Sequence, residues 1–437
     1  MSASTFRTSN VGNVSEAAGA APARETGAPA AQRRAPLAGI RILDLTSVML
    51  GPYATQTLGD YGADIIKIEA PDGDTTRKTG PAKEPGMAAT FVGANRNKRS
   101  IVLDLKQAAG RDALLQLVDH ADVLLYSLRP QKIAALGLAP DTLRQRNRRL
   151  IVVGVHGFAE DGPCGGKPAY DDIIQALCGL ASLHEMRDGV PAYAPSVIAD
   201  KTCGLFAAQA VLIALIGRGA DGEGTYVEVP MLEAMVNYTL VEHYYGMHFQ
   251  PPLSPPGYAR LLTRNRQPYK TADGYICVVP YTDQHWRHFF VEVGRQDLAA
   301  DTRFIGIAAR TQNIDALYAL AGEHLRDRTT AQWLAAFERL DIPAAPINKL
   351  ADLENDPHLK AMRFFVDVDD PAMGRVRMPG APLRFENTSC PMTMPPRLGE
   401  HSVEVLREAG MAQLSIDALL SSRAAVQWQP RKTTQET

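Results

Sequence analysis

Short apolar runs alternate with helical patterns along the first half of the chain. The runs IRILDL (40–45) and DIIKIEAP (64–71) each predict a buried strand, because short apolar segments bounded by turn residues are typical of parallel sheets. Between them, GPYATQTLGDYGA (51–63) has helical spacing, with Pro52 suited to a first turn and Gly62 to a stop. Together these segments predict a β-α-β unit, the building block of a parallel sheet.

The same alternation continues through residue 158. Strand patterns in KRSIVLDL, DVLLYSL and LIVVGVHGF accompany the helical pattern GRDALLQLVDHA. Strands and helices alternating at this pace predict an α/β fold, with an open, parallel, Rossmann-like sheet in a large domain over residues 37–240. The first strand-to-helix turn reads TSVMLGPY rather than GxGxxG, which disfavours a nicotinamide or flavin enzyme.

After this domain the chain becomes rich in proline and arginine. The segment QPPLSPPGYARLLTRNRQPYKTADGY predicts a linker, and GYICVVPYTDQHWRHFFVEVG begins the pattern of a smaller α/β domain over residues 255–350. Residues 351–437 are expected to form a linker and a C-terminal segment that returns to the large domain. Residues 1–36 are rich in Ala, Ser, Pro and Gly, and this composition predicts a disordered tail.

Composition narrows the range of partners. The 437 residues carry 46 Lys and Arg against 48 Asp and Glu, a net charge of -2 that gives no electrostatic reason to expect nucleic acid or a membrane surface. The longest apolar run, Cys203–Ile216, falls short of the roughly 20 residues needed to span a bilayer and predicts a core helix. Five scattered cysteines predict a cytoplasmic protein with no zinc or other metal site and no disulfide framework.

Aspartates stand at the start of two apolar helical patterns. Asp200 heads VIADKTCGLFAAQAVLIALIG, where it suits either an N-cap or, as a poorly hydrated carboxylate, a nucleophile. Asp171 and Asp172 begin the helix in AYDDIIQALCGL. Neighbouring residues of a helix point in different directions, so at most one of these two can face a shared site. The residues alone leave the capping and catalytic interpretations open.

Basic and imidazole side chains add further candidates. His156 ends a buried strand, where α/β sheets place ligands, although a lone His is more often structural. One basic cluster suits either phosphate binding or a solvated turn. It consists of Arg96, Lys98, Arg99 and Lys106. A second cluster, in the linker, suits a carboxylate clamp. It consists of Arg260, Arg264 and Arg266.

Several segments together resemble the class III CoA-transferases, the group of formyl-CoA transferase and carnitine CoA-transferase, which share their fold with the α-methylacyl-CoA racemases. The matching motifs are LAGIRILDLTSVMLGPYATQTLGDYGADIIKIEAPDGDTTR, NRNKRSIVLDLK, PAYDDIIQALCGL, VIADKTCGLFAAQAVLIAL and PRLGEHSVEVLREAG. The resemblance covers about residues 37 to 422. It implies an interlocked homodimer, in which each chain threads through a ring formed by the other.

The resemblance also implies roles for particular residues. The family's catalytic aspartate falls in VIADKTCG, which implies Asp200 as the nucleophile toward an acyl-CoA thioester, with Asp171 and Tyr170 in support. CoA would then pass to a free carboxylic acid through aspartyl mixed-anhydride and thioester intermediates. The CoA thioester is expected as a substrate, with no tightly bound cofactor. Its implied contacts are Val48, Met49, Leu50, Arg77, Arg99, Lys106 and Leu128.

Two departures bear on CoA binding, because this chain has Ala70 and Ala135 where the family often has arginines. Some phosphate contacts must therefore come from elsewhere. The arginines of the linker lead us to expect a short dicarboxylic acid such as succinate, mesaconate, itaconate or glutarate. A transfer between the two carboxyls of one such acid is an alternative.

Two other functions compete with CoA transfer. Racemases of this fold carry His-Asp where this chain has Tyr170-Asp171. Proton exchange by two bases needs a group that titrates near neutral pH, which His supplies and Tyr does not, so the transferase is favoured. A non-catalytic acyl-CoA-binding protein is disfavoured, because a pure binder gains nothing from burying carboxylates beside a phosphorylated ligand.

Overall fold

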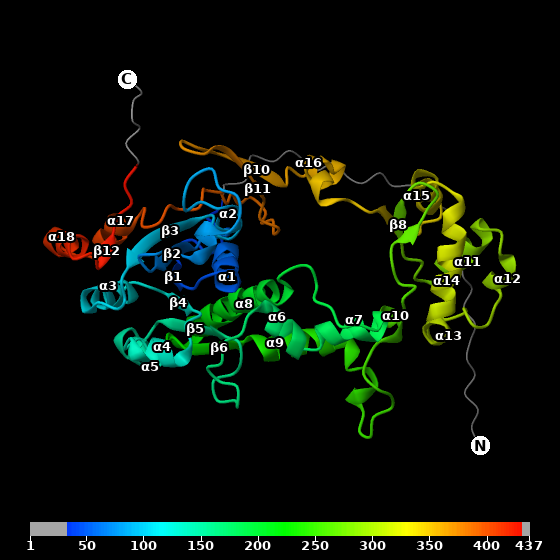
Figure 1. The fold of residues 1–437 in the computed structure, drawn as a ribbon, viewed down its shortest axis with the longest axis horizontal. Helices are drawn as coiled ribbons and strands as arrows, with labels where there is room; N and C mark the ends of the chain where they lie inside the picture. Colours follow the sequence, from blue (N-terminus) through cyan, green and yellow to red (C-terminus); the bar gives the residue numbers. More distant parts are fainter. Residues whose placement is uncertain (1–32, 431–437) are drawn as a thin grey trace, which may run out of the picture.

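The computed structural model describes residues 33–430 of the chain (Figure 1). The predicted disordered tail over residues 1–36 lies outside the described residues up to residue 32. A central sheet organises the large domain, and most of its strands coincide with the apolar runs of the sequence. Its strands are β1 (Arg41–Leu45), β2 (Asp64–Glu69), β3 (Lys98–Leu103), β4 (Val123–Tyr126), β5 (Ile151–His156), β6 (Tyr226–Pro230) and β12 (Ala425–Val426).

The order of the central sheet is β12-β3-β2-β1-β4-β5-β6, and only β12 runs antiparallel to its neighbour. Strands β4 and β5 are buried along their whole length, because other elements cover both faces of the sheet. The order 3-2-1-4-5-6 is that of dinucleotide-binding Rossmann sheets, in which ligands bind where the order reverses. That point lies between β1 and β4. The predicted α/β fold with an open, parallel, Rossmann-like sheet is confirmed.

The connections between these strands contain most of the helices. They are α1 (Leu50–Gly59), α2 (Ala89–Ala94), α3 (Ala108–Val118), α4 (Pro130–Ala135), α5 (Pro140–Arg146), α6 (Asp171–Leu177), α7 (Leu180–Asp188), α8 (Ile198–Asp221) and α9 (Met231–His243), with the short 3-10 helices η1 (Thr75–Lys78) and η2 (Tyr245–His248). Helix α1 ends at Gly59, three residues before the predicted stop. Gly62, with a φ of 95°, belongs instead to the turn into β2.

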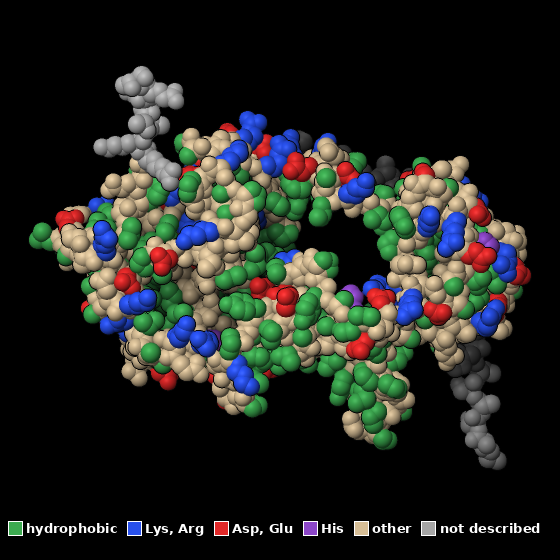
Figure 2. Space-filling model, viewed as in Figure 1, with side chains coloured by type: hydrophobic (Ala, Val, Ile, Leu, Met, Phe, Trp, Pro, Cys, Tyr) green, Lys and Arg blue, Asp and Glu red, His purple; other side chains and the backbone are tan. Residues whose placement is uncertain are grey.

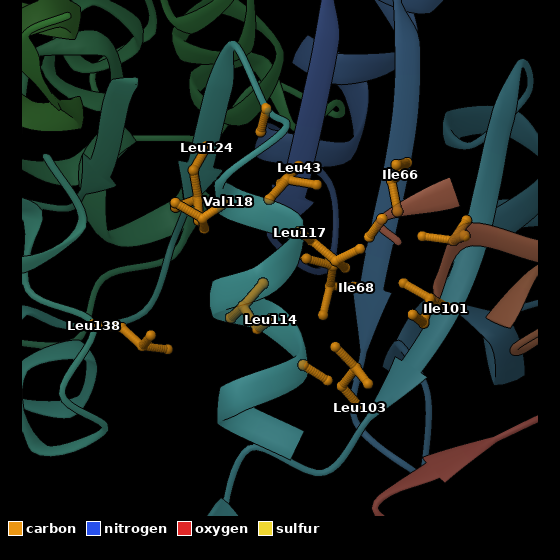
Figure 3. Packing of buried hydrophobic residues seen from close by; sticks show 14 of the residues in the cluster. Leu43, Ile66, Ile68, Ile101, Leu103, Leu114, Leu117, Val118, Leu124 and Leu138 are labelled. Atoms are coloured by element: carbon orange, nitrogen blue, oxygen red, sulfur yellow. The ribbon is translucent and has the colours of Figure 1, made fainter. Parts of the chain in front are cut away.

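Each face of the sheet has its own hydrophobic core, because successive side chains of a strand point to opposite faces. Figure 3 shows the first core, where Leu114 and Leu117 of α3 pack beside Leu43, Ile66 and Ile68 of the sheet. The second core lies under α1, α6, α8 and α9. It includes Ile42, Ile65, Val153, Ala207 and Val211.

Helix α8 is longer than the apolar run that predicts it, with 24 residues. By length and composition alone it could span a membrane, a criterion that the core helices of soluble proteins also meet. One face, with Cys203, Ala207 and Val211, is buried against α1 and the sheet. The other face leaves Ile213 and Ile216 61% and 77% exposed. The helix is therefore apolar on both faces but covered on only one.

The predicted smaller domain has a separate, aromatic core. Trp286, Phe289, Trp333 and Phe337 pack there around the three-stranded sheet β7-β8-β9. Its strands are β7 (Tyr269–Lys270), β8 (Tyr275–Val278) and β9 (Ala344–Pro346). Its helices are α10 (Ala259–Leu262), α11 (Asp283–Glu292), α12 (Gln296–Ala299), α13 (Ile307–Gln312), α14 (Ile314–His324), η3 (Leu325–Asp327) and α15 (Thr330–Arg339).

A long return segment brings the chain back to the large domain, where β12 pairs with β3. Its elements are η4 (Leu350–Asn355), α16 (Pro357–Ala361), β10 (Phe365–Asp370), β11 (Gly374–Pro379), α17 (Ser402–Glu408) and α18 (Gln413–Ser421). Because the outgoing and returning connections run apart, the two domains enclose an opening through the molecule (Figures 1 and 2). A single chain therefore forms a ring.

Candidate active site

A cavity of about 370 Å³ lies at the carboxyl ends of the central strands. Its walls come from the turns after β1, β4 and β5 and from the first turn of α8, beside the point where the strand order reverses. The lining residues include Ser47, Val48, Met49, Leu50, Leu128, Arg129, Lys132, His156, Gly157, Phe158, Lys167, Tyr170 and Asp200. The cavity thus brings together six residues that the sequence predicts at one site: Val48, Met49, Leu50, Leu128, Tyr170 and Asp200.

Close packing of α8 on α1 places Asp200 in this cavity. A Cβ on Gly204 would lie 2.8 Å from the carbonyl oxygen of Leu50, so only glycine permits this approach of the two helices. Asp200 precedes Gly204 by four residues and therefore lies on the same face of α8. Its carboxylate shares the cavity with the turn from Val48 to Leu50.

Asp200 does not cap its helix, so the capping interpretation is wrong. Helix α8 begins at Ile198, and Asp200 sits inside its first turn without a side-chain capping bond. The supporting acid is Asp171, whose Oδ1 accepts the backbone N–H of Asp200 at 3.0 Å. Asp171 Oδ2 accepts Nε2 of Gln175 at 2.6 Å. Asp171 is buried and Asp172 is exposed, so only one of the pair faces the site, as the helical spacing predicts.

Burial and neighbouring acids raise the pKa of Asp200 from 3.8 to about 6. Burial is the largest cause, and the negative charges of Asp171 and Asp172 add to it. At neutral pH the carboxylate is still mostly ionised, but it is poorly hydrated and more basic than an ordinary aspartate. Both properties favour nucleophilic attack. Tyr170 is 71% exposed at the rim, where it can touch a ligand.

A buried ion pair holds the turn after β1. Val48 has a φ of 72°, a costly conformation for a β-branched residue, on the order of 1–3 kcal/mol. Its N–H donates to the carboxylate of Asp74 at 3.2 Å, and Lys67 Nζ donates to Asp74 Oδ2 at 3.0 Å. Lys67 also donates to the carbonyl of Thr46 at 3.0 Å. Because the Val48 N–H already donates to Asp74, the N–H groups of Met49 and Leu50 are the ones in this turn that could donate to a developing oxyanion.

Three cations line the cavity, and none was singled out from the sequence. They are Arg129, Lys132 and Lys167. Arg129 and Lys132 flank the start of α4 in SLRPQKIAALG, and Lys167 precedes the turn into α6. Ala135 replaces an expected arginine in the same segment as Arg129 and Lys132. That missing charge was the signal in the sequence that other basic residues must bind the phosphates. These side chains suit the phosphates of a nucleotide.

Arg77, Arg99 and Lys106, the other predicted CoA contacts, lie outside the lining of this cavity. Arg77 is buried, donates to both carboxylate oxygens of Glu69 at 2.6 and 2.7 Å, and stacks on Phe91. Its charge is therefore compensated within the fold. Arg99 pairs with acids at the sheet edge and on α17. Its partners are Asp64, Glu404 and Glu408. Lys106 is exposed at the end of β3.

The other basic residues of that cluster are also internal. Arg96 pairs with Asp60, and Lys98 Nζ donates to Asp44 Oδ2 at 3.1 Å in a fully buried pair. Arg96 and Lys98 therefore stabilise the fold through partners within the chain. A run of cations in the sequence could not reveal this, because their acidic partners lie about 36 to 54 residues away.

The predicted substrate clamp does not line this cavity either. Arg260 donates to the hydroxyl of Tyr318 at 2.8 Å in the small domain. Arg264 donates to the carbonyls of Arg187 and Asp188 and so closes the end of α7. Arg266 is exposed. Within one chain, Arg260 and Arg264 therefore have other partners.

The fold and the site place a carboxylate with a raised pKa in the crevice of a nucleotide-binding type of sheet. The sequence model of CoA-transferase family III matches residues 37–402, and the chain belongs to this family. It is therefore a CoA-transferase, and its substrates are of the acyl-CoA and carboxylic acid classes.

Known proteins similar to this chain agree in length as well as in fold. The succinate–glutarate CoA-transferase of Agrobacterium fabrum is 33% identical over 86% of this chain and 96% of that protein. The succinyl-CoA:mesaconate CoA-transferase of Haloarcula hispanica is 32% identical over 85% of this chain and 96% of that protein. A crystal structure of a CAIB/BAIF family protein from Brucella suis is 30% identical, covers 86% and 100% of the two chains, and superposes with a TM-score of 0.73.

Proposed function

We propose that this enzyme moves CoA from the thioester of one short dicarboxylic acid to the free form of another, with Asp200 as the covalent nucleophile. The observation that carries the proposal is the carboxylate of Asp200, with its pKa raised to about 6, in a cavity lined by three cations. The similar proteins that act on succinate, glutarate and mesaconate support the choice of substrate class.

The reaction needs no metal and no net proton transfer. Asp200 attacks the thioester carbonyl, the C–S bond breaks, and an aspartyl anhydride and the CoA thiolate form. The thiolate then attacks the aspartyl carbonyl, which releases the first acid and leaves an aspartyl-CoA thioester. The second acid attacks this thioester to give a new anhydride, and the thiolate takes the new acyl group. Every anhydride would be lost to water, so the site must exclude it.

Cationic charge in the cavity favours substrates with a second carboxylate. Arg129, Lys132 and Lys167 exceed the one acid, Asp200, that lines the same cavity. The phosphates of CoA and a distal carboxylate together supply the negative charge that would pair with these three cations. Arg260, Arg264 and Arg266 do not line this cavity, so Arg129, Lys132 and Lys167 are its basic side chains. A transfer between the two carboxyls of one acid would use the same groups.

A matched pair of donors tests the substrate class. Succinyl-CoA and butyryl-CoA have the same number of acyl carbons and differ only at the distal carboxylate. We expect kcat/KM with succinyl-CoA to exceed that with butyryl-CoA by at least about 100-fold, because cations without a partner carboxylate stay unsatisfied. Equal rates with the two donors would overturn the dicarboxylate assignment and leave the transferase chemistry standing.

Trapping tests the covalent step. The protein is incubated with succinyl-CoA, treated with hydroxylamine or borohydride, and digested for mass spectrometry. We expect modification of the peptide that contains Asp200, and none in Asp200→Asn. If no donor labels Asp200, while a branched acyl-CoA exchanges its α-hydrogen with heavy water, the chain is a racemase on the same fold.

We also propose that the enzyme is an interlocked homodimer. A second chain would pass through the opening seen in Figure 2, and the uncovered apolar face of α8 would give that chain a surface to bury. Analytical ultracentrifugation should give twice the mass of one chain. We expect Ile216→Glu on α8 to weaken the dimer, whereas Leu414→Glu, equally exposed on α18, leaves it intact. A monomeric wild-type protein at micromolar concentration would contradict this proposal.

A further inference from the structure

Polar side chains gather on one face of the sheet where β4, β5 and β6 lie side by side. Tyr126, Gly154 and Glu228 are neighbours in register across these strands. His156 follows Gly154 by two residues and therefore points to the same face, and Glu160 lies in the loop after β5. The opposite face of β5, with Val153, packs in the core under α8. The cluster therefore lies on the sheet face opposite α8, although His156 also lines the cavity that holds Asp200.

Gly154 is what lets these polar atoms converge. A Cβ at this position would lie 2.7 Å from His156 Nε2, 2.8 Å from the Tyr226 hydroxyl and 3.0 Å from the Tyr126 hydroxyl. Any other residue would push at least one of them away. Glycine weakens a strand interior, and its presence there is typical of a place where other groups must approach the backbone closely.

The cluster carries negative charge without a basic partner. One ring nitrogen of His156 and one carboxylate oxygen each of Glu160 and Glu228 lie within 4.8 Å of one another. The backbone N–H of Glu160 donates to Glu228 Oε1 at 2.7 Å and holds the two acids together. Among residues 33–430, no Lys or Arg forms an ion pair with Glu160 or Glu228. Two carboxylates fixed this close together favour a cation between them.

The imidazole of His156 gives an independent indication that a ligand binds at this cluster. The His156 side chain is 5% exposed, and its Nε2 makes no hydrogen bond within the described part of the chain. Glu160 Oε1 lies 2.9 Å from this nitrogen, but the angle of approach does not fit a hydrogen bond. A buried nitrogen without a partner is costly unless another ligand uses its lone pair.

We propose that His156 Nε2 and one oxygen each from Glu160 and Glu228 bind a divalent transition-metal ion. Imidazole suits Zn²⁺, and carboxylates suit Mn²⁺, so one nitrogen and two oxygens favour these two ions over Mg²⁺. The Tyr226 hydroxyl donates to Glu160 Oε1 at 2.5 Å and fits the outer-shell partner that orients a carboxylate ligand. The ion ties the loop after β5 to β6. Since Gly157 and Phe158 of that loop line the cavity, the ion braces one of its walls.

Metal binding tests this directly. Full-length protein without a histidine tag is stripped with a chelator and then titrated with Zn²⁺, Mn²⁺ and Mg²⁺ by calorimetry. Elemental analysis after dialysis gives the stoichiometry. We expect one Zn²⁺ or Mn²⁺ per chain and much weaker Mg²⁺. We expect Glu228→Gln to weaken binding by more than about 10-fold, the range in which even outer-shell changes are felt.

The matched control is Asp161→Asn, which removes the same charge from the neighbouring loop but no ligand. We expect it to change the affinity by less than about 2-fold, because it changes only the local field. Equal weakening in Glu228→Gln and Asp161→Asn would show that the acids merely attract ions. Co²⁺ provides a test on the wild-type protein alone, whatever the variants do to folding. Absence of visible ligand-field bands from the wild-type protein loaded with Co²⁺, or absence of stoichiometric binding, would overturn the proposal.

Discussion

Two acids near the same cavity have pKa values that are shifted in opposite directions. Asp44, at the end of β1, is fully buried, and its pKa is lowered to about 2. Asp200, at the start of α8, is half-buried, and its pKa is raised to about 6. Burial alone raises the pKa of both groups. The more deeply buried acid is nevertheless the stronger one, so burial does not decide the outcome.

The difference lies in the partners. Asp44 accepts from Lys98 Nζ at 3.1 Å and from the hydroxyls of Thr46 and Thr55, and Lys67 adds a second positive charge. Asp200 has two acids as neighbours instead. The first region uses paired charge to hold a strained turn rigid. The second leaves a charge uncompensated, which is costly for stability but makes the group reactive.

Removing the reactive charge should have the largest effect. We expect Asp200→Asn to lower the rate of CoA transfer by at least about 1,000-fold, because an amide cannot form the anhydride. Steady-state assays with succinyl-CoA measure this. The control is Asp188→Asn on the exposed end of α7, which removes an equal charge outside the cavity. Near-normal turnover in Asp200→Asn would show that the carboxylate is not the nucleophile.

Removing a paired charge should instead affect folding. We expect Lys67→Met to lower the free energy of unfolding by about 3–5 kcal/mol, because it leaves Asp74 and Asp44 buried with fewer partners and releases the Val48 turn. Urea denaturation measures the change. Lys78→Met, which removes an exposed lysine nearby, should cost less than about 1 kcal/mol. Equal losses in the two variants would mean that the buried pair has no special role.

The sequence predicts the reactive region better than the paired one. The apolar runs give β1, β2 and the other parallel strands, and the motif VIADKTCG gives Asp200, because both signals are local. The sequence does not reveal that Arg77 pairs with Glu69 and also donates to the carbonyl of Pro396, 319 residues away. Such pairing leaves no local pattern. A run of basic residues therefore suggests a binding site in the sequence, because its acidic partners become known only from the structure.

The same limit applies to the cavity cations and to the His156 cluster. Arg129 and Lys132 sit in an ordinary helical segment, and only the three-dimensional placement of α4 brings them near Asp200. Glu228 comes from β6, 68 residues after Glu160, so no metal-ligand spacing appears in the sequence. Gly154 was the one local signal, a glycine inside an apolar strand.

The comparison also predicts that the reactive acid destabilises the fold. Asp200 binds its proton more tightly in the folded state, with a pKa of about 6, than in the unfolded state, near 3.8. Wild-type stability should therefore fall as the pH rises through this window. Asp200→Asn removes the cost, and we expect it to raise the free energy of unfolding by about 1–3 kcal/mol at pH 8.

This gain should disappear below about pH 3, where Asp200 is protonated in both states of the wild-type protein. Denaturation curves of the two proteins at pH 8 and at about pH 3 separate the electrostatic effect from a change in packing. A gain that persists unchanged at the lower pH would assign it to packing. A loss of stability at pH 8 would contradict the raised pKa.

The smallest change should come from the neighbouring acids. The amide oxygen of Asp171→Asn can still accept the Asp200 N–H, but the negative charge that raises the pKa of Asp200 is gone. We therefore expect the acidic limb of the pH–rate profile for acylation to move to lower pH. Asp172→Asn should move it in the same direction by less, because Asp172 contributes less to the raised pKa. If Asp171→Asn leaves the limb in place while slowing the reaction at every pH, Asp171 acts by holding the start of α8 rather than through its charge.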